Sequence, residues 1–360
     1  MRRLGLGLGM ALSLGAFGAC SGDDEPGAKQ HTPHPDASLV DGPVGDAGMD
    51  HSNGDGGGEA GDADLPFDGP AKLSETGLFT DMATRTLAPD VMPFDVRYPV
   101  WHDGAPSNRF VYLPPGAQID TSYMDVWSFP TGTRAWKEFY KDGKLVETRY
   151  LEKRAEGADG WLKVSYLWDE AKQDGAAVPG GVKNALGTTH DVPDSETCTQ
   201  CHNGAGDVLI GVSAIQSSKE AGGGFLTTLA SKNLLSHPPG KEFPMPGDGL
   251  VEDVLGYLHG NCGHCHNDTN WLAKIRTLRY KVPVDVATPE ETPTYKTNID
   301  ALMNHITLDT TIAVIPGNPG KSQVYVRMGL RDDNGMPNFD TKEVDTAAVA
   351  MMESWINGLK

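Results

Sequence analysis

Two copies of the pentad Cys-x-x-Cys-His constrain this chain more than any other feature. They span residues 198–202 and 262–266 and contain four of the five cysteines in the 360 residues. On a helical turn, residues i and i+3 share a face, so the two thiols of a pentad can both reach the edge of one flat ligand. The histidine after the second thiol can then bind a metal at the centre of that ligand. The spacing is typical of covalent haem attachment, and it predicts haem c at both pentads, two haems per chain.

Paired cysteines also occur in zinc ribbons, in redox-active dithiols and in disulfides. In this chain sixty residues separate the two pairs, which is far more than a compact zinc ribbon uses. Zinc would also not require a histidine directly after each pair. We therefore expect covalent haem attachment at Cys198, Cys201, Cys262 and Cys265, and proximal iron ligation by His202 and His266.

The fifth cysteine ends an N-terminal export signal. Residues 1–20 begin with a positive charge, continue with an apolar stretch and end on Ala19-Cys20. Such a segment is too short for a membrane span and is typical of a secretory signal. Because it ends on cysteine, it resembles a bacterial lipoprotein signal, which implies that Cys20 carries lipid and anchors the protein to a membrane. A plain secretory signal cut near Ala19 is the alternative, and both interpretations place the mature chain in the periplasm or at the outer membrane.

Residues 21–70 have the composition of a disordered tether. They contain twelve acidic residues against one lysine, together with eleven glycines. A segment with so few large apolar side chains cannot bury enough surface to offset the entropy of ordering. Its net charge of −11 is more than half of the −19 of the whole chain. We expect this tether to hold a folded body away from the membrane surface.

Residues 71–185 show the signals of a β-rich domain. The dipeptide Asp142-Gly143 predicts a tight turn between two strands, and the alternation in Trp161–Trp168 is typical of a strand that covers a core. Five of the seven tryptophans lie in this region, and we expect them to be core residues rather than the lining of a ligand site. The predicted strands are Phe110–Leu113, Met124–Phe129, Arg134–Tyr140, Leu145–Leu151 and Trp161–Trp168.

A repeated pattern follows each pentad. A methionine–proline pair comes first, at Met245-Pro246 and at Met336-Pro337, and a helical stretch comes next, at residues 249–259 and 341–358. A c-type haem needs a sixth ligand on its distal face, and a methionine thioether is a common one. Proline after methionine disfavours the helical conformation there, which keeps the sulfur on a loop. The pattern therefore predicts a first haem domain, atypical in form, at residues 186–259 and a second at residues 260–360.

The distal ligands are assigned to Met336 for the second haem and to Met245 for the first. For the first haem, His237 and His190 are the alternatives. For the second haem, the alternatives are Met303, His305 and Met328. His264, inside the second pentad, is expected to contact a propionate or solvent rather than iron.

These features resemble a group of bacterial dihaem c-type cytochromes, mostly uncharacterised, in which a β-rich module precedes two haem domains. The matching segments are Leu73–Phe79, Trp101–Ala105, Trp127–Thr133, Glu147–Arg149 and Gly160-Trp161 in the β-rich part, and Tyr257–Cys262, Pro316–Pro319 and Met336-Pro337 in the haem part. The resemblance implies an α+β multidomain fold, with a β-rich N-terminal domain followed by two small, mainly α-helical cytochrome c-like domains. It also implies electron transfer outside the cytoplasm.

Electron transfer between proteins is the function that these patterns favour. The body is acidic, with a net charge of −10 over residues 71–360, which favours redox partners with basic docking surfaces, and no nucleic acid partner is expected. The alternative is a dihaem peroxidase-like oxidoreductase, in which one haem has an open distal position and the β-rich domain binds substrate or partner. The sequence shows no distal acid–base residue beside the first haem, so no catalytic residue is assigned.

Overall fold

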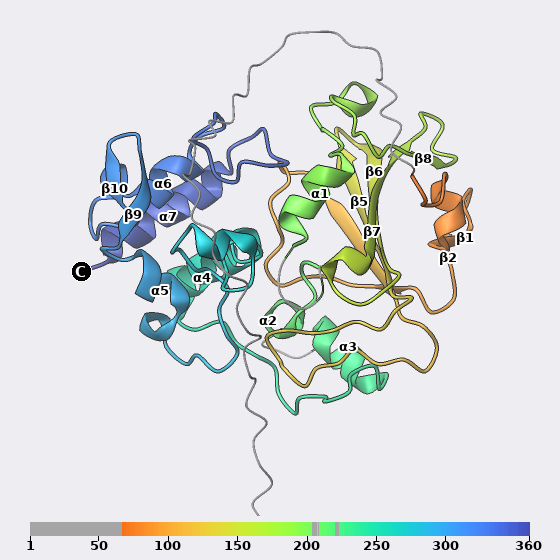
Figure 1. Cartoon of the computed structure of the whole chain (residues 1–360), viewed down its shortest axis with the longest axis horizontal. Helices are drawn as coiled ribbons and strands as arrows, with labels where there is room; N and C mark the ends of the chain where they lie inside the picture. The colour runs from red at the N-terminus through yellow and green to blue at the C-terminus, as the bar shows by residue number, and fades with distance from the viewer. Residues whose placement is uncertain (1–66, 204–206, 208, 220–222) are drawn as a thin grey trace, which may run out of the picture. The chain divides into compact units, whose positions relative to one another are not determined.

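An antiparallel meander of six strands forms the main sheet of this computed structural model (Figure 1). The structure describes residues 67–203, 207, 209–219 and 223–360, all within a unit that spans Asp62–Lys360. Each strand of the sheet pairs with the next one in the chain. The strands are β3 (Met92–Pro93), β4 (Ser107–Tyr112), β5 (Arg134–Lys141), β6 (Lys144–Lys153), β7 (Trp161–Trp168) and β8 (Gly175–Ala177). Two separate ladders join β1 (Phe79–Asp81) to β2 (Thr86–Leu87) and β9 (Leu302–Thr307) to β10 (Thr310–Ile312).

The strand predictions that correspond to β4, β5, β6 and β7 are confirmed. The turn at Asp142-Gly143 is confirmed as well, because both residues have the positive φ (52° and 73°) that a two-residue hairpin turn requires. The strand predicted at Met124–Phe129 is wrong: the Val126 N–H closes a turn there, and Ser128 pairs only through an isolated bridge. The aromatic residues of this segment are buried although they lie in a loop. Residue type alone does not distinguish such a loop from a strand, which is why the prediction failed.

One face of the sheet is covered by aromatic and aliphatic side chains. Phe110, Trp136, Tyr150 and Val164 stand opposite one another on four neighbouring strands and are at most 8% exposed. Cross-strand pairs of this kind stabilise a sheet. The expectation that the tryptophans are core residues is confirmed for Trp136, Trp161 and Trp168, which are at most 4% exposed, whereas Trp127 is buried but also lines a cleft.

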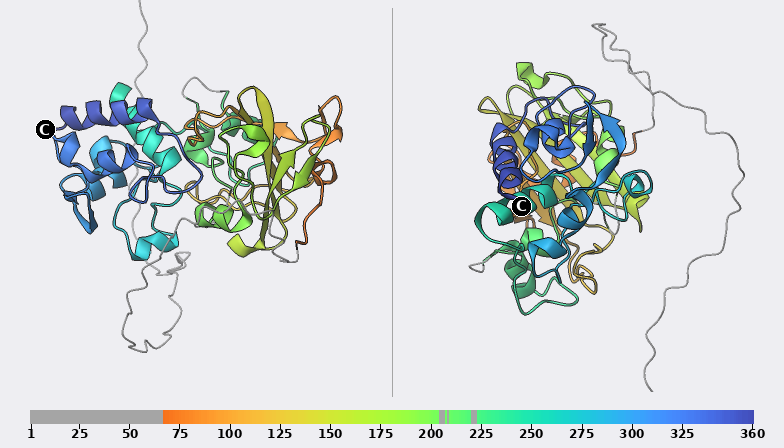
Figure 2. Two further views of the ribbon diagram at one scale, coloured as in Figure 1. Left: turned by 90° about the horizontal axis from the view of Figure 1, so that it is seen from above. Right: turned by 90° about the vertical axis from the view of Figure 1, so that its left-hand side faces the viewer.

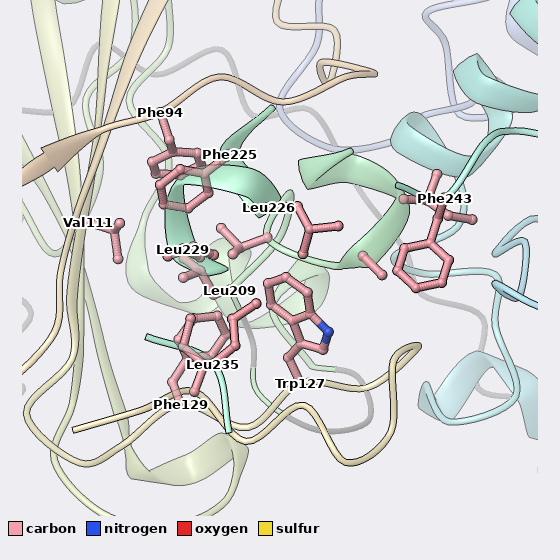
Figure 3. Close-up of a cluster of buried hydrophobic side chains, with 14 of the residues drawn as sticks. Phe94, Val111, Trp127, Phe129, Leu209, Phe225, Leu226, Leu229, Leu235 and Phe243 are labelled. Carbon is pink, nitrogen blue, oxygen red and sulfur yellow. The ribbon is translucent and has the colours of Figure 1, made fainter. Parts of the chain in front are cut away.

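The opposite face of the sheet has two parts. Toward one end, Val111 and Ala135 belong to an apolar cluster that α2 (Ala214–Ser217) and α3 (Phe225–Ser231) help to build (Figure 3). Figure 3 shows Phe225 of α3 against Phe94 beside the sheet, and their ring centroids are 4.9 Å apart. Toward the other end, the same face carries charged side chains in register on three strands, namely Arg109, Lys137 and Arg149.

Two helices of thirteen residues, α4 (Gly249–Asn261) and α7 (Thr346–Gly358), pack together around a second apolar cluster (Figures 1 and 2). α7 begins later than predicted because the Asp345 carboxylate accepts a hydrogen bond from the Ala348 N–H and caps the helix there. The remaining α-helices are α1 (Ser195–Cys201), α5 (Pro293–Asn298) and α6 (Gln323–Met328). The 3-10 helices are η1 (Leu73–Thr76), η2 (Ala158–Gly160), η3 (Ala185–Gly187), η4 (Trp271–Lys274), η5 (Pro289–Glu291) and η6 (Pro319–Lys321).

The predicted architecture, a β-rich domain followed by two small helical cytochrome c-like domains, is wrong. Helix makes up only 27% of the structure, and a six-stranded antiparallel sheet dominates it. The physical reason is that α1, α2 and α3 are too short to build a core of their own. The apolar residues of α2 and α3 are buried in the same cluster as those of the sheet.

α4 contributes to both clusters. Leu255 packs in the cluster with the sheet, while Val254 and Leu258 pack in the cluster with α7. Gly256 leaves room for a close approach on another side, since a Cβ there would lie 2.0 Å from the Tyr98 ring. One helix therefore links the sheet to the C-terminal helices.

In the part of the chain that the structure describes, no helix combines the length and the apolar character that crossing a membrane requires. The predicted export signal with Cys20 and residues 21–66 of the predicted tether lie outside the described residues.

Candidate functional site

The first pentad forms most of α1. The Asp194 carboxylate caps this helix by accepting a hydrogen bond from the Thr197 N–H at 2.6 Å, and the helix places Cys198 and Cys201 one turn apart. His202 follows as the C-terminal cap, and its N–H donates to the Cys198 carbonyl at 2.9 Å. α1 packs against β7, so the first pentad lies on the sheet (Figure 1). The helical turn expected from the spacing is confirmed.

The second pentad begins where α4 ends. Cys262 caps the helix, and the N–H groups of Cys265 and His266 both donate to its carbonyl, at 3.2 and 2.8 Å. The His266 ring packs edge to face against Tyr280, with ring centroids 5.4 Å apart. Desolvation lowers the pKa of His266 to about 4, so its imidazole is neutral at pH 7, as a metal ligand must be.

The two pentads, far apart in the sequence, lie side by side. The thiols of Cys201 and Cys265 and the imidazole of His264 each offer a ligand atom within 4.8 Å of the others. A hydrogen bond of 2.6 Å from the Asn270 amide to the Asn203 carbonyl joins the segments that follow the pentads. Sequence spacing does not predict this convergence, because it depends on how α1 and α4 pack.

A cleft opens between the pentads. The cleft is open to solvent and has a volume of about 100 Å³. Its walls include Cys201 and His202 from the first pentad and Gly263 and His264 from the second. The other walls combine apolar and polar side chains, among them Trp127, Phe129, Leu209, Val212, Gln216, His259 and Lys281.

Buried polar atoms in this cleft suit an additional group. Trp127 Nε1 and His264 Nδ1 are buried and have no hydrogen-bond partner among the described residues, and both side chains line the cleft. A carboxylate, such as a haem propionate, would accept a hydrogen bond from the indole N–H. The four pentad thiols are free. The residues present therefore fit covalently attached haem.

The thiols of the first pentad do not have the properties of a redox-active dithiol. Burial raises the pKa of Cys198 to about 12. A hydrogen bond to Cys265, together with burial, raises the pKa of Cys201, and the same bond lowers the pKa of Cys265. A redox-active dithiol depends on a lowered thiol pKa. The first pentad shows the opposite.

Zinc is the main alternative for the place where the pentads meet. A closed structural zinc site uses four protein ligands. Within the described ranges, the residues that gather closely enough for a metal are Cys201, His264 and Cys265, and this group leaves Cys198 and Cys262 out. Haem attachment uses both thiols of each pentad, so the donor set favours haem.

Met336, the predicted distal ligand of the second haem, lies on a loop anchored beside the second pentad. Its N–H donates to the Arg327 carbonyl at 2.9 Å, and Arg327 Nε donates to the Asn334 carbonyl at 2.7 Å. After desolvation, the charge of Arg327 is among the causes of the low pKa of His266, so the guanidinium lies near that imidazole. Met328, the neighbour of Arg327, packs in the cluster that contains Cys262 and Tyr280, and Tyr280 packs against the His266 ring.

The alternatives to Met336 lie elsewhere. Met328 is buried in the cluster around α7, and Met303 packs at its edge. The side chain of His305 lies outside the described part of the structure. The assignment to Met336 stays a prediction, supported by the position of its loop.

Met245, the predicted distal ligand of the first haem, is 2% exposed and packs in the apolar cluster beside the sheet. The residues that line the cleft do not include it. Of the two alternatives, His237 is exposed with Nδ1 2.9 Å from Ser236 Oγ, and His190 is buried with Nε2 2.7 Å from the Glu147 carboxylate. The distal ligand of the first haem therefore stays a prediction.

His259, to which the sequence analysis gives no role, lines the cleft from α4. The Val282 N–H donates to its Nδ1 at 3.0 Å, so the neutral ring carries its proton on Nε2. Burial lowers the pKa of His259 to about 3, which keeps the ring neutral at pH 7. The wall of the cleft therefore contains a side-chain hydrogen-bond donor. The signal in the sequence is its position one helical turn before Cys262.

Arg149 of β6 binds two carboxylates near the first pentad. Its guanidinium donates to Asp340 at 2.5 and 2.9 Å and to Glu147 at 2.8 and 3.2 Å. Burial, the largest single cause, raises the pKa of each carboxyl, but the charge of Arg149 and the hydrogen bonds from Arg149 and a histidine together outweigh it, so both pKa values are lowered. Behind burial, the charges of these three groups also act on the Cys198 thiol, so the cluster lies close to it.

His102 and Lys137 extend this cluster. Lys137 stands between Arg109 and Arg149 in the register of the sheet, and its Nζ lies 2.5 Å from His102 Nε2. His102 Nδ1 lies 3.4 Å from Asp340. Burial lowers the pKa of Lys137, and burial together with the charge of Lys137 lowers the pKa of His102 to about 3. The sequence signal is a charged residue at core-facing positions of the predicted strands.

Buried neutral histidines predict a loss of stability in mild acid, and His102 and His259 have lower pKa values than His266. In the unfolded chain His102 and His259 become protonated below about pH 6.5, whereas in the folded protein they stay neutral down to about pH 3. The unfolded state therefore binds more protons between these pH values, so the free energy of unfolding decreases as the pH falls. Each histidine contributes about 1.4 kcal/mol per pH unit between pH 6 and 4. Urea unfolding at pH 7, 5.5 and 4.5 measures this slope. The variant His259→Asn should show a smaller slope than the unmodified protein, and an equal slope would contradict the prediction.

No protein-family model, no curated protein and no solved structure matches this chain. The resemblance to dihaem cytochromes therefore rests on the sequence motifs. The chemistry of the site follows from its own residues.

Proposed function

We propose that this protein is a dihaem c-type cytochrome that transfers electrons through two covalently attached haems. The observation that carries the proposal is the convergence of the two pentads, with ligand atoms of Cys201, His264 and Cys265 within 4.8 Å of one another. Haems attached to neighbouring pentads would lie close together, which suits electron exchange between them. A site for a single ligand would not need two attachment motifs.

Each residue type in the pentads has a role in this proposal. Haem, when bound, supplies a reversible one-electron couple. The thiols attach it, and the imidazoles of His202 and His266 hold its iron from the proximal side. Met336 and Met245 are the proposed distal ligands, and a thioether ligand raises the reduction potential.

The environment of the protein is part of the proposal. An export signal ending at Cys20 supports a periplasmic or outer-membrane lipoprotein held by its lipid. The acidic body, with a net charge of −10 over residues 71–360, supports redox partners that carry basic docking surfaces.

The test is to express the full chain in a host with an active haem-attachment system and to count what it carries. We expect two haems and two irons per chain and no zinc, measured by haemochrome absorbance, elemental analysis and intact mass. An unmodified chain from a host that matures a control cytochrome, or stoichiometric zinc in place of iron, would overturn the proposal.

The proximal role of His266 gives a sharper test. His266→Ala should keep haem attached through the thioethers of the second pentad but convert one of the two irons to the high-spin state, because the proximal ligand is lost. Electron paramagnetic resonance of the oxidised protein measures the spin states. His264→Ala serves as the control and should leave both irons low-spin, and a low-spin spectrum for His266→Ala would exclude the assignment.

A dihaem peroxidase-like oxidoreductase is the second candidate, and one observation favours it. The cleft beside the first pentad contains the Nε2–H donor of His259 and the amine of Lys281, groups that can bind an oxygen ligand on an open iron. This function requires a high-spin haem in the unmodified oxidised protein and peroxide turnover that falls in His259→Asn. An entirely low-spin spectrum without turnover would leave electron transfer alone.

A further inference from the structure

We propose that the β-sheet positions Met336: side chains of the β-rich part hold the loop of residues 336–343, and this docking decides whether the methionine sulfur can reach iron. This inference rests on the proposed function. In this inference the β-rich part positions the distal ligand of the second haem, although the second pentad lies outside that part in the sequence.

The first contact is the ion pair between Asp340 and Arg149. The two Nη atoms of Arg149 donate to the two carboxylate oxygens of Asp340 at 2.5 and 2.9 Å, and both side chains are 15% exposed. Paired charged hydrogen bonds of this kind fix orientation as well as distance. Arg149 itself is held from behind by Glu147, a residue of the same strand that is fully buried. Asp340 is therefore fastened to a rigid part of the sheet.

The second contact is made by Asp103, in the loop before β4. Its carboxylate accepts hydrogen bonds from two consecutive backbone N–H groups, Lys342 at 2.9 and 3.0 Å and Glu343 at 2.9 Å. Beside it, the Trp101 indole N–H donates to the Glu343 carbonyl at 3.0 Å, and Lys141 Nζ lies 2.9 Å from the Glu343 carboxylate. The loop is thus attached through its backbone as well as its side chains.

The other end of the loop is attached to Arg327, next to Met328, which packs in the apolar cluster that also contains Tyr280 and Cys262 of the second pentad. The Met336 N–H donates to the Arg327 carbonyl at 2.9 Å. Only three residues separate Met336 from Asp340, and an extended chain of that length reaches roughly 14 Å. The backbone of Met336 is therefore fixed on one side by the hydrogen bond to Arg327 and on the other by the ion pair of Asp340 with the sheet. These two attachments restrict the positions that the Met336 side chain can reach.

A thioether ligand on a loop is in equilibrium between a bound and a released state. Interactions that exist only when the loop is docked shift this equilibrium toward the bound state. The contacts of Asp103 and Asp340 belong to the docked loop, and neither carboxylate is a proposed iron ligand or attachment residue. Removing them should release the methionine while both haems stay attached.

The experiment uses the holoprotein with the substitutions Asp103→Asn and Asp340→Asn. Asp174→Asn is the matched control, because this carboxylate also accepts a backbone N–H, from Ser74 at 3.0 Å, but fastens a different loop. Met336→Ala defines the signal of complete ligand loss. The readouts are the near-infrared charge-transfer band of sulfur-ligated oxidised haem and the rate of cyanide binding, both recorded well below the melting temperature of each variant.

We expect two haems per chain in every variant, less than half of the near-infrared band in Asp103→Asn and Asp340→Asn, and cyanide binding at least tenfold faster than in the unmodified protein. Asp174→Asn should match the unmodified protein. A full band and an unchanged cyanide rate in both loop variants would overturn the inference while the proposed function stands. Absence of haem from the unmodified protein would instead defeat the proposed function. If Asp340→Asn does not fold, Asp103→Asn decides, since it removes the charge and one acceptor oxygen from a side chain that accepts hydrogen bonds from backbone groups alone.

Discussion

Replacing Cys198 and Cys201 by alanine should lower the haem content from two per chain to one. In the proposed function, thioether bonds to these two thiols would be the only covalent links of the first haem, so the variant should lose that haem during purification under denaturing conditions. Haemochrome absorbance per mole of protein and intact mass measure the change.

The matched control replaces Cys262 and Cys265 by alanine, which should give the same ratio of one through loss of the other haem. The variant without all four thiols should carry none. A ratio of two in either double variant would show that haem is held by other residues, and the attachment sites would then be wrong.

Arg149→Met should lower the free energy of unfolding by about 3–5 kcal/mol, because removing one partner of a buried ion pair leaves the other charge uncompensated. Here two carboxylates, Glu147 and Asp340, lose the same guanidinium. Methionine keeps much of the length of the side chain, so the loss of packing is small. Urea unfolding at pH 7 measures the effect.

The pH dependence identifies the cause. In the unmodified protein the pKa values of Glu147 and Asp340 are lowered, so their ion pairs stabilise the fold above about pH 4 and are lost as the pH falls. In Arg149→Met burial raises both pKa values, and protonation relieves the unpaired charges. The deficit of the variant should therefore be smaller at pH 5 than at pH 7. The control Arg154→Met breaks a more exposed pair with Glu152 and should cost at most about 1 kcal/mol; an equal loss for both variants would contradict the role of burial.

Local features of this fold were predictable from sequence because they depend on neighbouring residues. The Asp142-Gly143 turn, the strands on either side of it and α4 follow from turn chemistry and periodicity. The helical turn in each pentad follows from its own spacing. The late start of α7 was missed, although Asp345 is a good N-cap residue and marks the boundary.

The architecture was not predictable in the same way. The pentads indicated two helical domains, but whether short helices form a domain depends on what else covers their apolar faces. In this chain α3 packs on the sheet through Phe225 and Leu229, so the sheet takes the place that a further helix would have. No pattern within residues 186–259 reveals that partner.

In the candidate site, too, the features that depend on neighbouring residues were predictable and those that depend on distant contacts were not. The pentad residues were found from their spacing, whereas His259 and the cluster around Arg149 become visible only when distant segments meet. Asp340 is the clearest example, since its partner Arg149 is 191 positions away in the sequence. An isolated aspartate in a loop carries no sign of such a partner.

Because α4 packs in two apolar clusters, the chain cannot be cut at this helix without affecting both of them. A fragment ending before Gly249 would leave the sheet without Leu255, and a fragment starting there would leave Gly256 without the Tyr98 ring that fills its surface. Each fragment would expose apolar side chains that are buried in the intact protein, and we expect both fragments to aggregate. The sheet, α4 and the C-terminal helices therefore belong in one polypeptide, which contains both pentads.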